Sequence, residues 1–358
     1  MSEVAVVQTT PETYFDDVTR VMKLAGVDKL RNGRKTALKI NLSWSKFFPS
    51  CSTAPYSYDG VLNSLVNELG FPSDDLFTLE NETVVTSLPK GIQANRWAPV
   101  LKKYNHKFLE LPTAEWETVK LKRKTLVLEN YFGDIEVPKA LVGSNVIHLP
   151  TIKTHGHTQM TGAMKNAFGM LLRTVRHRSH MVIHEVLVDL LMVQKEVCGE
   201  LFTVTDGTII GDGAGPRTMV PRTGNLLIAS RDMVAADTTQ CLLMGIDPFG
   251  VKKLVLAERG RLGTMNPDKI RFVGDFSSAG ELPVTPTHPG KSPVIEGNRM
   301  VLNSPFWSIL WNKKLTRLGP VNASMWYHDY FWYPLIGKSH IKDFLKHNPW
   351  GKLYNQYG

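Results

Sequence analysis

An alternation of short apolar, β-type runs with segments of helical periodicity constrains the fold of this chain most strongly. Strand-like runs at 4–8, 36–42 and 76–79 are each followed by a segment whose apolar residues recur at helical spacing. Strands that alternate with helices are typical of a mostly parallel sheet covered by helices on both faces. The chain has 358 residues, 42% of them hydrophobic, which suffices for a sizeable core. We therefore expect a Rossmann-like layered α/β fold.

Changes in composition predict how the chain is divided. Residues 1–274 carry the alternating pattern, except at 113–138, where polar and apolar residues alternate as in an antiparallel hairpin or edge addition. Residues 275–299 are rich in Pro, Gly, Ser and Thr, which is typical of a linker or a long surface loop. Residues 300–358 are rich in aromatic side chains. We expect this C-terminal extension to be a packed appendage or a dimer contact, with binding to a membrane as the alternative.

The net charge indicates the kind of partner, and the cysteines indicate which cross-links and metal sites to exclude. A formal net charge of +9 favours anionic partners, and the basic residues are dispersed, so we expect a small anion rather than nucleic acid. The three cysteines (Cys51, Cys198 and Cys241) have no paired spacing, which argues against disulfides and against a four-cysteine metal site. No signal peptide and no apolar run of about 18 residues is evident. These features favour a cytoplasmic protein.

Polar side chains gather at 145–172, where we expect a strand, a loop and a helix. Lys153, His155 and His157 occupy alternate positions of the expected loop, and six of the eleven histidines lie between His148 and His184. Side chains at i and i+2 of an extended segment point the same way, so both loop histidines could reach one substrate or one metal ion. Basic neighbours could lower the pKa of Lys153 and suit it to general-base chemistry. Passive binding of an anion by a basic loop is the alternative.

Two further groups of side chains extend this candidate site. Thr161 and Gly162 would begin a helix whose free N–H groups attract an anion, with Lys165 and Asn166 one turn further on. His177, His180 and His184 share a helical face, which suits a metal ion, but the arginines interleaved among them favour an anion. We expect His177 to contact the substrate.

The remaining candidates lie at the ends of other expected strands. Asp206 ends a strand and precedes a glycine-rich run that we interpret as a flexible loop. The run lacks the order of glycines typical of a nicotinamide site. Asp237 we interpret as an ion-pair residue. Besides His177, the candidate side chains and loop positions outside 145–172 are Lys39, Asn41, Glu80, Asp206, Gly213 and Gly215.

Several blocks of the sequence resemble the DUF362 family, over about 35–274. They are LPTIKTH at 149–155, TGAMKNAFG at 161–169, TDG at 205–207, GAGP at 213–216, ASRDMVAAD at 229–237 and MGIDP at 244–248. KINL at 39–42 resembles the family's earlier Lys-Pro-Asn block with Ile40 in place of the proline, and Glu80 resembles its strand-end glutamate. Many members add a ferredoxin-like segment with cysteine-rich motifs. This chain has none, so the resemblance does not extend to an iron–sulfur cluster.

Histidine and lysine side chains placed together suit acid–base chemistry near neutral pH. The leading hypothesis is a biosynthetic or tailoring enzyme, a homodimer, that isomerises, eliminates or cyclises a small anionic substrate without a cofactor. Lys39, Lys153, His155 and Lys165 would handle protons or the anion, and Asp206 would orient them. The alternatives are a metal-dependent or redox protein with a divalent metal on His155, His157 and Asp206, and a non-catalytic binder of an anionic metabolite or a membrane surface.

Overall fold

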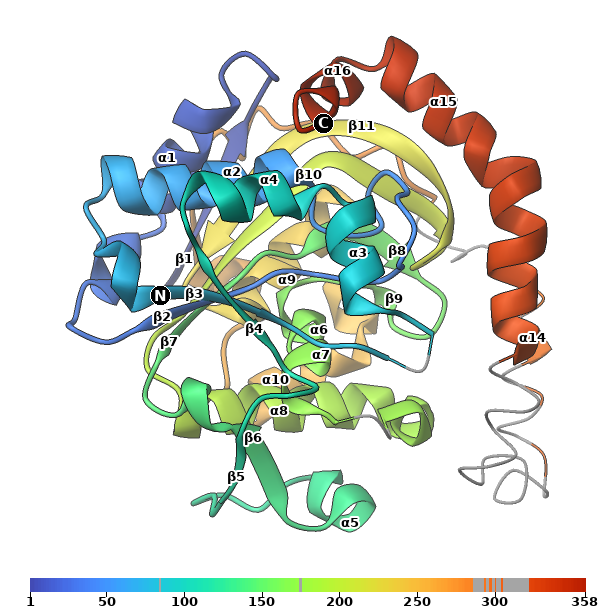
Figure 1. Cartoon of the computed structure of the whole chain (residues 1–358). Coiled ribbons are helices and arrows are strands. Elements are labelled where there is room, and N and C mark those ends of the chain that lie inside the picture. Colours follow the sequence, from blue (N-terminus) through green and yellow to red (C-terminus); the bar gives the residue numbers. More distant parts are fainter. Residues whose placement is uncertain are drawn as a thin grey trace.

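The computed structural model describes residues 1–83, 85–173, 176–285, 293, 296, 297, 300, 304 and 322–358, and of residues 176–178 only the backbone. Within the linker expected at 275–299, residues 286–292, 294, 295, 298 and 299 therefore lie outside the described residues. Ten strands form one sheet (Figure 1): β1 (Ser2–Gln8), β2 (Thr36–Lys39), β3 (Leu76–Glu80), β4 (Lys107–Glu110), β7 (Asn145–His148), β8 (Thr151–His155), β9 (Gln159–Met160), β10 (Leu201–Ala214), β11 (Thr218–Ser230) and β12 (Ile270–Gly274).

The main path of the sheet has the strand order β12-β1-β11-β10-β7-β2-β3-β4, and β8 and β9 extend it beside β10. Every pairing on this path is parallel except the two that β11 makes. The mostly parallel sheet expected from the sequence is therefore confirmed. It also fixes a geometry that matters for function, because the carboxyl ends of β2, β3 and β7 meet at one edge.

Helices cover both faces of the sheet. The α-helices of the main domain are α1 (Tyr14–Leu24), α2 (Pro55–Asn63), α3 (Leu88–Ala94), α4 (Trp97–Lys103), α6 (Ala163–Asn166), α7 (Phe168–Leu171), α8 (Ile183–Val197), α9 (Met233–Leu243) and α10 (Lys252–Arg259). The short 3-10 segments are η1 (Val27–Leu30), η3 (Ser73–Asp75), η4 (Lys139–Leu141), η5 (Arg176–Val182), η6 (Pro248–Gly250) and η7 (Pro267–Lys269), and η2 (Ser64–Glu68) is a π-helical segment.

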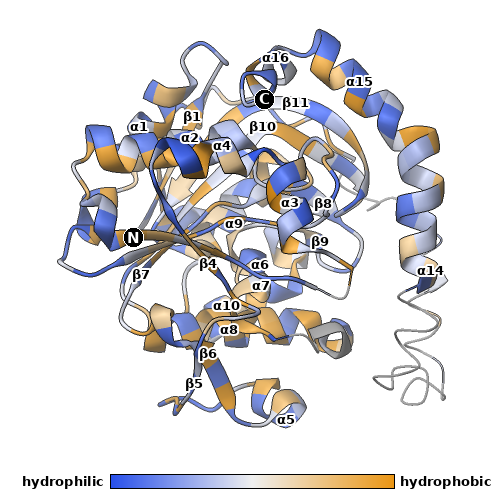
Figure 2. Ribbon diagram, viewed as in Figure 1, coloured by the Kyte–Doolittle hydropathy of each residue, from blue (hydrophilic) through white to orange (hydrophobic). Residues whose placement is uncertain are grey.

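Adjacent residues of β1 show how the two layers form. Val4 and Val6 belong to a core cluster with α8, α9 and α10, whereas Ala5 and Val7 belong to a second cluster with α1, α2 and α4. Successive side chains of a strand point to opposite faces, so an uninterrupted apolar run buries both faces at once. In Figure 1, α1, α2 and α4 lie above the sheet and α8 and α10 below it, and hydrophobic residues follow the central strands in Figure 2.

The small antiparallel addition is present as the pair β5 (Trp116–Val119) and β6 (Ile135–Pro138). The alternation between them does not continue as strand, because α5 (Leu128–Phe132) intervenes. Asp189 of α8 accepts hydrogen bonds from the backbone N–H groups of Leu126 (2.7 Å), Val127 (2.8 Å) and Leu128 (3.0 Å). The buried carboxylate of Asp189 thus fixes this turn and the start of α5. The sequence around α5 does not indicate this contact, because Asp189 lies far along the chain.

The glycine-rich run after Asp206 is strand rather than the expected flexible loop. It lies within β10, which pairs with β11 up to Ala214. A side chain at Gly211 would collide with Met219 and Lys153, and one at Gly215 would collide with the carbonyl of Thr154. The glycines allow β8, β10 and β11 to approach closely.

The C-terminal extension is helical where it is described and packs on the α/β domain. It comprises α14 (Asn322–Met325), the π-helical η9 (Trp326–Gly337), α15 (Lys338–His347) and α16 (Pro349–Asn355). Trp44 donates a hydrogen bond to Asp329 (2.6 Å) and packs against Trp332 and Tyr333. None of the described helices has the length and hydropathy needed to cross a bilayer.

Candidate functional site

Four of the polar residues highlighted by the sequence are the last residues of their strands. Lys39 ends β2, Glu80 ends β3, His148 ends β7 and His155 ends β8. The first three strands are neighbours and parallel, so their ends lie at one edge of the sheet, close to α6 and α7 (Figure 1). Ligands of open α/β sheets usually bind outside this edge. Burial and hydrogen bonding then distinguish which of these side chains a ligand could reach.

Lys39 and Glu80 form a buried ion pair. The Lys39 Nζ lies 2.7 Å from Glu80 Oε2, and both residues are at most 2% exposed. Glu80 also accepts the N–H groups of Leu42 (2.9 Å) and Asn81 (2.8 Å), and Lys39 donates to the carbonyl of Ile40. This pair joins β2 to β3 in the interior. The geometry therefore does not favour the expected proton-handling role of Lys39 or substrate contact by Glu80.

His148 and Asn166 form a second buried network. His148 Nε2 lies 2.7 Å from Gln194 Oε1, and Asn166 Nδ2 donates to the carbonyl of Lys39 (2.8 Å). Burial lowers the pKa of His148 to about 4. The hydrogen bond that His148 donates to Gln194 opposes this shift, and the charge of Lys39 acts in the same direction as burial. Asn166 thus holds α6 onto the end of β2, and its amide is engaged in the interior rather than directed to a substrate.

Lys153 and Asp206 lie on the other face of the sheet. Lys153 Nζ donates to Thr151 Oγ1 (2.5 Å) and the carbonyl of Cys51 (2.8 Å), with a longer contact to the carbonyl of Ser50 (3.4 Å). Burial lowers its pKa to about 8 and raises that of Asp206 to about 6. The ammonium group of Lys153 thus fixes the loop at 50–51 onto β8, which contradicts its expected place in a basic surface loop.

Asn41 and the two glycines named from the sequence also serve local structure. Asn41 Nδ2 donates to the carbonyl of Cys51 (3.0 Å). The N–H of Gly213 donates to Thr154 Oγ1 (2.8 Å), and Gly215 packs against the carbonyl of Thr154. Asn41 thus joins the end of β2 to the loop at 50–51. The two glycines lie against β8, the strand that carries His155.

An internal carboxylate occupies the helix start expected to bind an anion. The N–H of Ala163 donates to Asp237 Oδ1 (2.6 Å), and a side chain at Gly162 would collide with this carboxylate. Asp237 pairs with Lys253 (2.9 Å), and both residues are at most 1% exposed. Thr161 donates to the carbonyl of Thr151 (2.9 Å). This geometry does not favour the expected ligand contact of Thr161 and Gly162, whereas the interpretation of Asp237 as an ion-pair residue is confirmed.

A cluster of basic and aromatic side chains around His155 reaches the surface. It consists of His155, His157, Lys165, Phe168 and His180, from β8, the following turn, α6, α7 and η5. Ring centres lie 6.0 Å apart for His155 and His157, 5.4 Å for His157 and His180, and 5.8 Å for Phe168 and His180. Lys165 Nζ lies 5.7 Å from the centre of the Phe168 ring. His155 is buried, whereas the other four are half-buried.

His155 is held as a neutral imidazole. The backbone N–H of His157 donates to its Nδ1 (3.1 Å), so the ring proton of the neutral form is on Nε2. Burial keeps the pKa of His155 well below its ordinary value, and the charges of Lys165, His157 and His180 act in the same direction. The ring therefore offers an N–H donor next to a lysine at physiological pH.

The metal site proposed as an alternative is not assembled. Asp206 pairs in register with Thr151, four residues before His155 on β8, which corresponds to about 13 Å along the strand. Among the described residues, no group of three or more His, Cys, Asp or Glu side chains could hold a metal ion. The side chain of His177 lies outside the described residues.

Some residues that shape the site have no local sequence signal. Lys253 donates to the carbonyl of Thr161 across 92 positions of the chain, and Phe168 packs beside His180. His180 carried a signal, the helical spacing with His184, but nothing in the sequence joined it to His157. Lys253 and Phe168 each lie in a helix, where such residues usually serve ordinary packing, so their sequence positions do not indicate a site.

Comparison with known proteins gives a family and one relative. The family model described as "Domain of unknown function (DUF362)" matches residues 36–241. The chain is also 30% identical over 161 residues to the thylakoid-associated protein sll1697 of Synechocystis sp.. That match covers 43% of this chain and 48% of the relative, so the chain spans about half the length of that protein. No solved structure matches the chain.

Proposed function

Because this chain belongs to the DUF362 family, a domain of unknown function, we propose its activity from its own geometry: it is an enzyme that acts on a small anionic substrate at the cluster of His155, His157, Lys165 and His180. The observation that carries this proposal is the buried imidazole of His155, held by the N–H of His157 beside Lys165. A ring kept neutral in this way can donate a hydrogen bond to an oxyanion without competing as a base.

The reaction that suits this arrangement is proton transfer at a carbon next to a carboxylate or carbonyl group. The imidazole of His157 or His180, at the half-buried rim, takes the proton from carbon. The electron pair moves onto the substrate oxygen, where the Nε2–H of His155 and the charge of Lys165 stabilise it. Return of the proton to another carbon gives isomerisation, and loss of a leaving group gives elimination. Ring closure onto an electrophile gives cyclisation by the same first step.

Solvent exchange tests this proposal without knowledge of the natural substrate. The full-length chain is incubated in D2O with small 2-oxo and 2-hydroxy carboxylates, and loss of the C–H signal is followed by proton NMR. We expect at least one carboxylate to exchange, and His155→Gln to slow that exchange by 10²-fold or more. Lys165→Gln should also slow the exchange, because it removes the charge that stabilises the substrate oxygen. Lys102→Gln, at an exposed position of α4, is its matched control.

Three outcomes would contradict the proposal. One is exchange at the wild-type rate in a folded His155→Gln variant. Another is the absence of both exchange and binding, measured calorimetrically, for every carboxylate and for inorganic phosphate. The third is binding of an anion with no exchange, which would mean that the protein binds anions but does not catalyse the proposed proton transfer.

Localisation and assembly belong to the same proposal. The cytoplasmic location and the homodimer expected from the sequence are to be measured by cell fractionation and light scattering. The name of the Synechocystis relative associates that protein with thylakoids. Association with a membrane surface is therefore a second property to test, and the C-terminal helices offer a specific place for it.

A further inference from the structure

The segment from Trp326 to His347 forms a continuous but bent helical rod, η9 followed by α15, along one side of the molecule (Figure 1). One side of this rod packs on the α/β domain through His328, Trp332, Gly337 and Phe344, all of which are buried. Tyr333 donates a hydrogen bond to the carbonyl of Phe47 (3.1 Å). The rod is thus fixed in place, and its opposite side faces outward.

The outward side of η9 carries large apolar residues. Trp326 is 62% exposed, Tyr330 71% and Leu335 66%, and Phe331 and Ile336 are also exposed. In a π-helix the hydrogen bonds join residues five apart, so side chains spaced by four or five share a face. Single exposed apolar residues are ordinary on a protein surface, but several on one helical face mark a contact surface.

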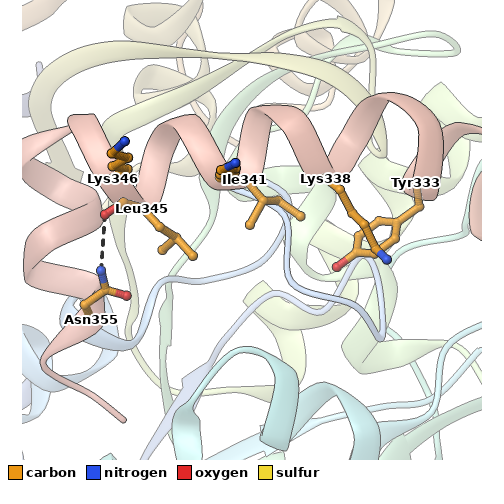
Figure 3. A pocket seen from close by; sticks show the side chains of 7 residues that line it. Tyr333, Lys338, Ile341, Leu345, Lys346 and Asn355 are labelled. Carbon is orange, nitrogen blue, oxygen red and sulfur yellow. Dashed lines mark hydrogen bonds between the residues drawn. The ribbon is translucent and has the colours of Figure 1, made fainter.

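The outward side of α15 continues this surface with positive charge. Lys338, Lys342 and Lys346 follow one another at i, i+4 and i+8, and all three are exposed. They border a shallow groove with Tyr333, Ile341 and Leu345 in its lining, and Figure 3 shows Lys338 and Lys346 at the two ends of this row. The acidic residue of α15, Asp343, lies 2.9 Å from His347. The row therefore presents net positive charge.

We propose that this face of η9 and α15 docks on an anionic lipid surface. Trp326, Tyr330 and Leu335 enter the interfacial region, and the lysine row faces the lipid phosphates. Tryptophan and tyrosine favour the membrane interface because one end of each ring system is apolar and the other is polar. A helix with an apolar part and a basic part lies in the plane of the interface. This inference is independent of the proposed function, because it uses no residue of the histidine cluster.

Charge favours lipid over a second copy of the chain as the occupant. An anionic lipid surface attracts each lysine that lies near it. A second copy on the same face would bring the lysine rows of two chains, each with a net charge of +9, toward one another.

Vesicle flotation of the full-length chain tests the proposal. The vesicles are phosphatidylcholine alone or phosphatidylcholine with phosphatidylglycerol, at low and at high salt. We expect the chain to float with the anionic vesicles at low salt and to be released by salt. The variant K338Q/K342Q/K346Q should partition between about tenfold and a hundredfold more weakly, and Y330S/L335S should also lose binding. K120Q/K122Q/K124Q, which removes the same charge from exposed positions near β5, should bind like the wild type.

Three results would overturn the inference. They are absence of flotation with anionic vesicles, equal loss of binding in the control triple variant, and a dimer that Y330S/L335S dissociates while vesicle binding is unchanged. All substitutions are at exposed positions, and circular dichroism verifies that each variant is folded. Anion binding at the histidine cluster should be the same in all of these variants, so failure here is distinguishable from failure of the proposed function.

Discussion

Basic residues form two contrasting groups around the carboxyl edge of the sheet. Lys39, Lys153 and Lys253 are at most 2% exposed and donate to internal oxygens, two of them to a carboxylate. Lys165 is half-buried and lies with histidines that reach the surface. A buried ammonium group costs free energy unless its hydrogen bonds are made, so the first group is held for the fold. We therefore propose that the first group stabilises the fold and that Lys165 contributes to ligand binding.

Removal of Lys39 should have the largest effect on stability. Lys39→Ala leaves the carboxylate of Glu80 buried without its cation, and we expect the free energy of unfolding to fall by about 3–5 kcal/mol. Urea unfolding measures the change. Lys35→Ala, at an exposed position just before β2, should change it by less than about 0.5 kcal/mol. A loss of similar size in both variants would show that the buried ion pair of Lys39 contributes no special stability, which contradicts the account.

Asp237→Asn tests the pair that holds the start of α6. The amide still accepts the N–H of Ala163, but the buried charge of Lys253 loses its partner, so we expect a loss of about 2–3 kcal/mol. The double variant D237N/K253M removes both charges and should recover part of this loss. If the double variant is no more stable than Asp237→Asn, the loss does not come from an unpaired charge.

The division between the two groups was only partly predictable from the sequence. The strand ends near Lys39 and at Glu80 follow from local patterns, and parallel pairing then brings strand ends to one edge. His155 was expected in a loop but ends β8. Whether a lysine at such an end is satisfied internally depends on partners far along the chain, such as Glu80 for Lys39. No single sequence reveals these partners.

Local signals were also misleading where tertiary contacts decide the structure. Glycines at 207, 211 and 213 are typical of a flexible loop, yet they lie in β10 because β8 and β11 approach too closely for side chains. Gly162 and the small residues after it indicate an anion-binding helix start, yet Asp237 from α9 occupies it. In both cases the glycines correctly indicate that another group comes close to the backbone, but that group belongs to the protein itself and is not a ligand.

The pH dependence of stability separates buried histidines from exposed ones. The pKa of His148 is about 4 in the folded chain and about 6.5 when unfolded. Between these values only the unfolded state binds the proton, so stability falls as the pH falls, by about 1.4 kcal/mol per pH unit. Asp206, with its pKa raised to about 6, acts in the opposite direction below that pH.

The comparison is therefore made between variants. His148→Gln should unfold with a slope between pH 6.5 and 5 that differs from the wild-type slope by about one proton, as measured in urea at several pH values. His347→Gln, at an exposed position, is the control. Parallel slopes for the wild type and His148→Gln would mean that His148 titrates normally in the folded chain.

Lys165→Gln should have the smallest effect on stability. Because this side chain is half-buried and close to the surface, we expect a change of less than about 0.5 kcal/mol. The same variant should bind oxalate roughly tenfold more weakly, as measured by calorimetry. A large loss of stability with unchanged oxalate binding would place Lys165 with the buried lysines.

The state of the His155 ring tests the central claim most directly. Nitrogen-15 NMR of the full-length chain, with the resonance identified by its loss in His155→Gln, reports the tautomer and the protonation of this imidazole. The account predicts a ring that stays neutral, with its proton on Nε2, at pH values below the ordinary histidine pKa of about 6.5. It also predicts an Nε2 resonance that moves when oxalate is added. A ring that protonates near its ordinary pKa of about 6.5 and does not respond to oxalate would contradict it.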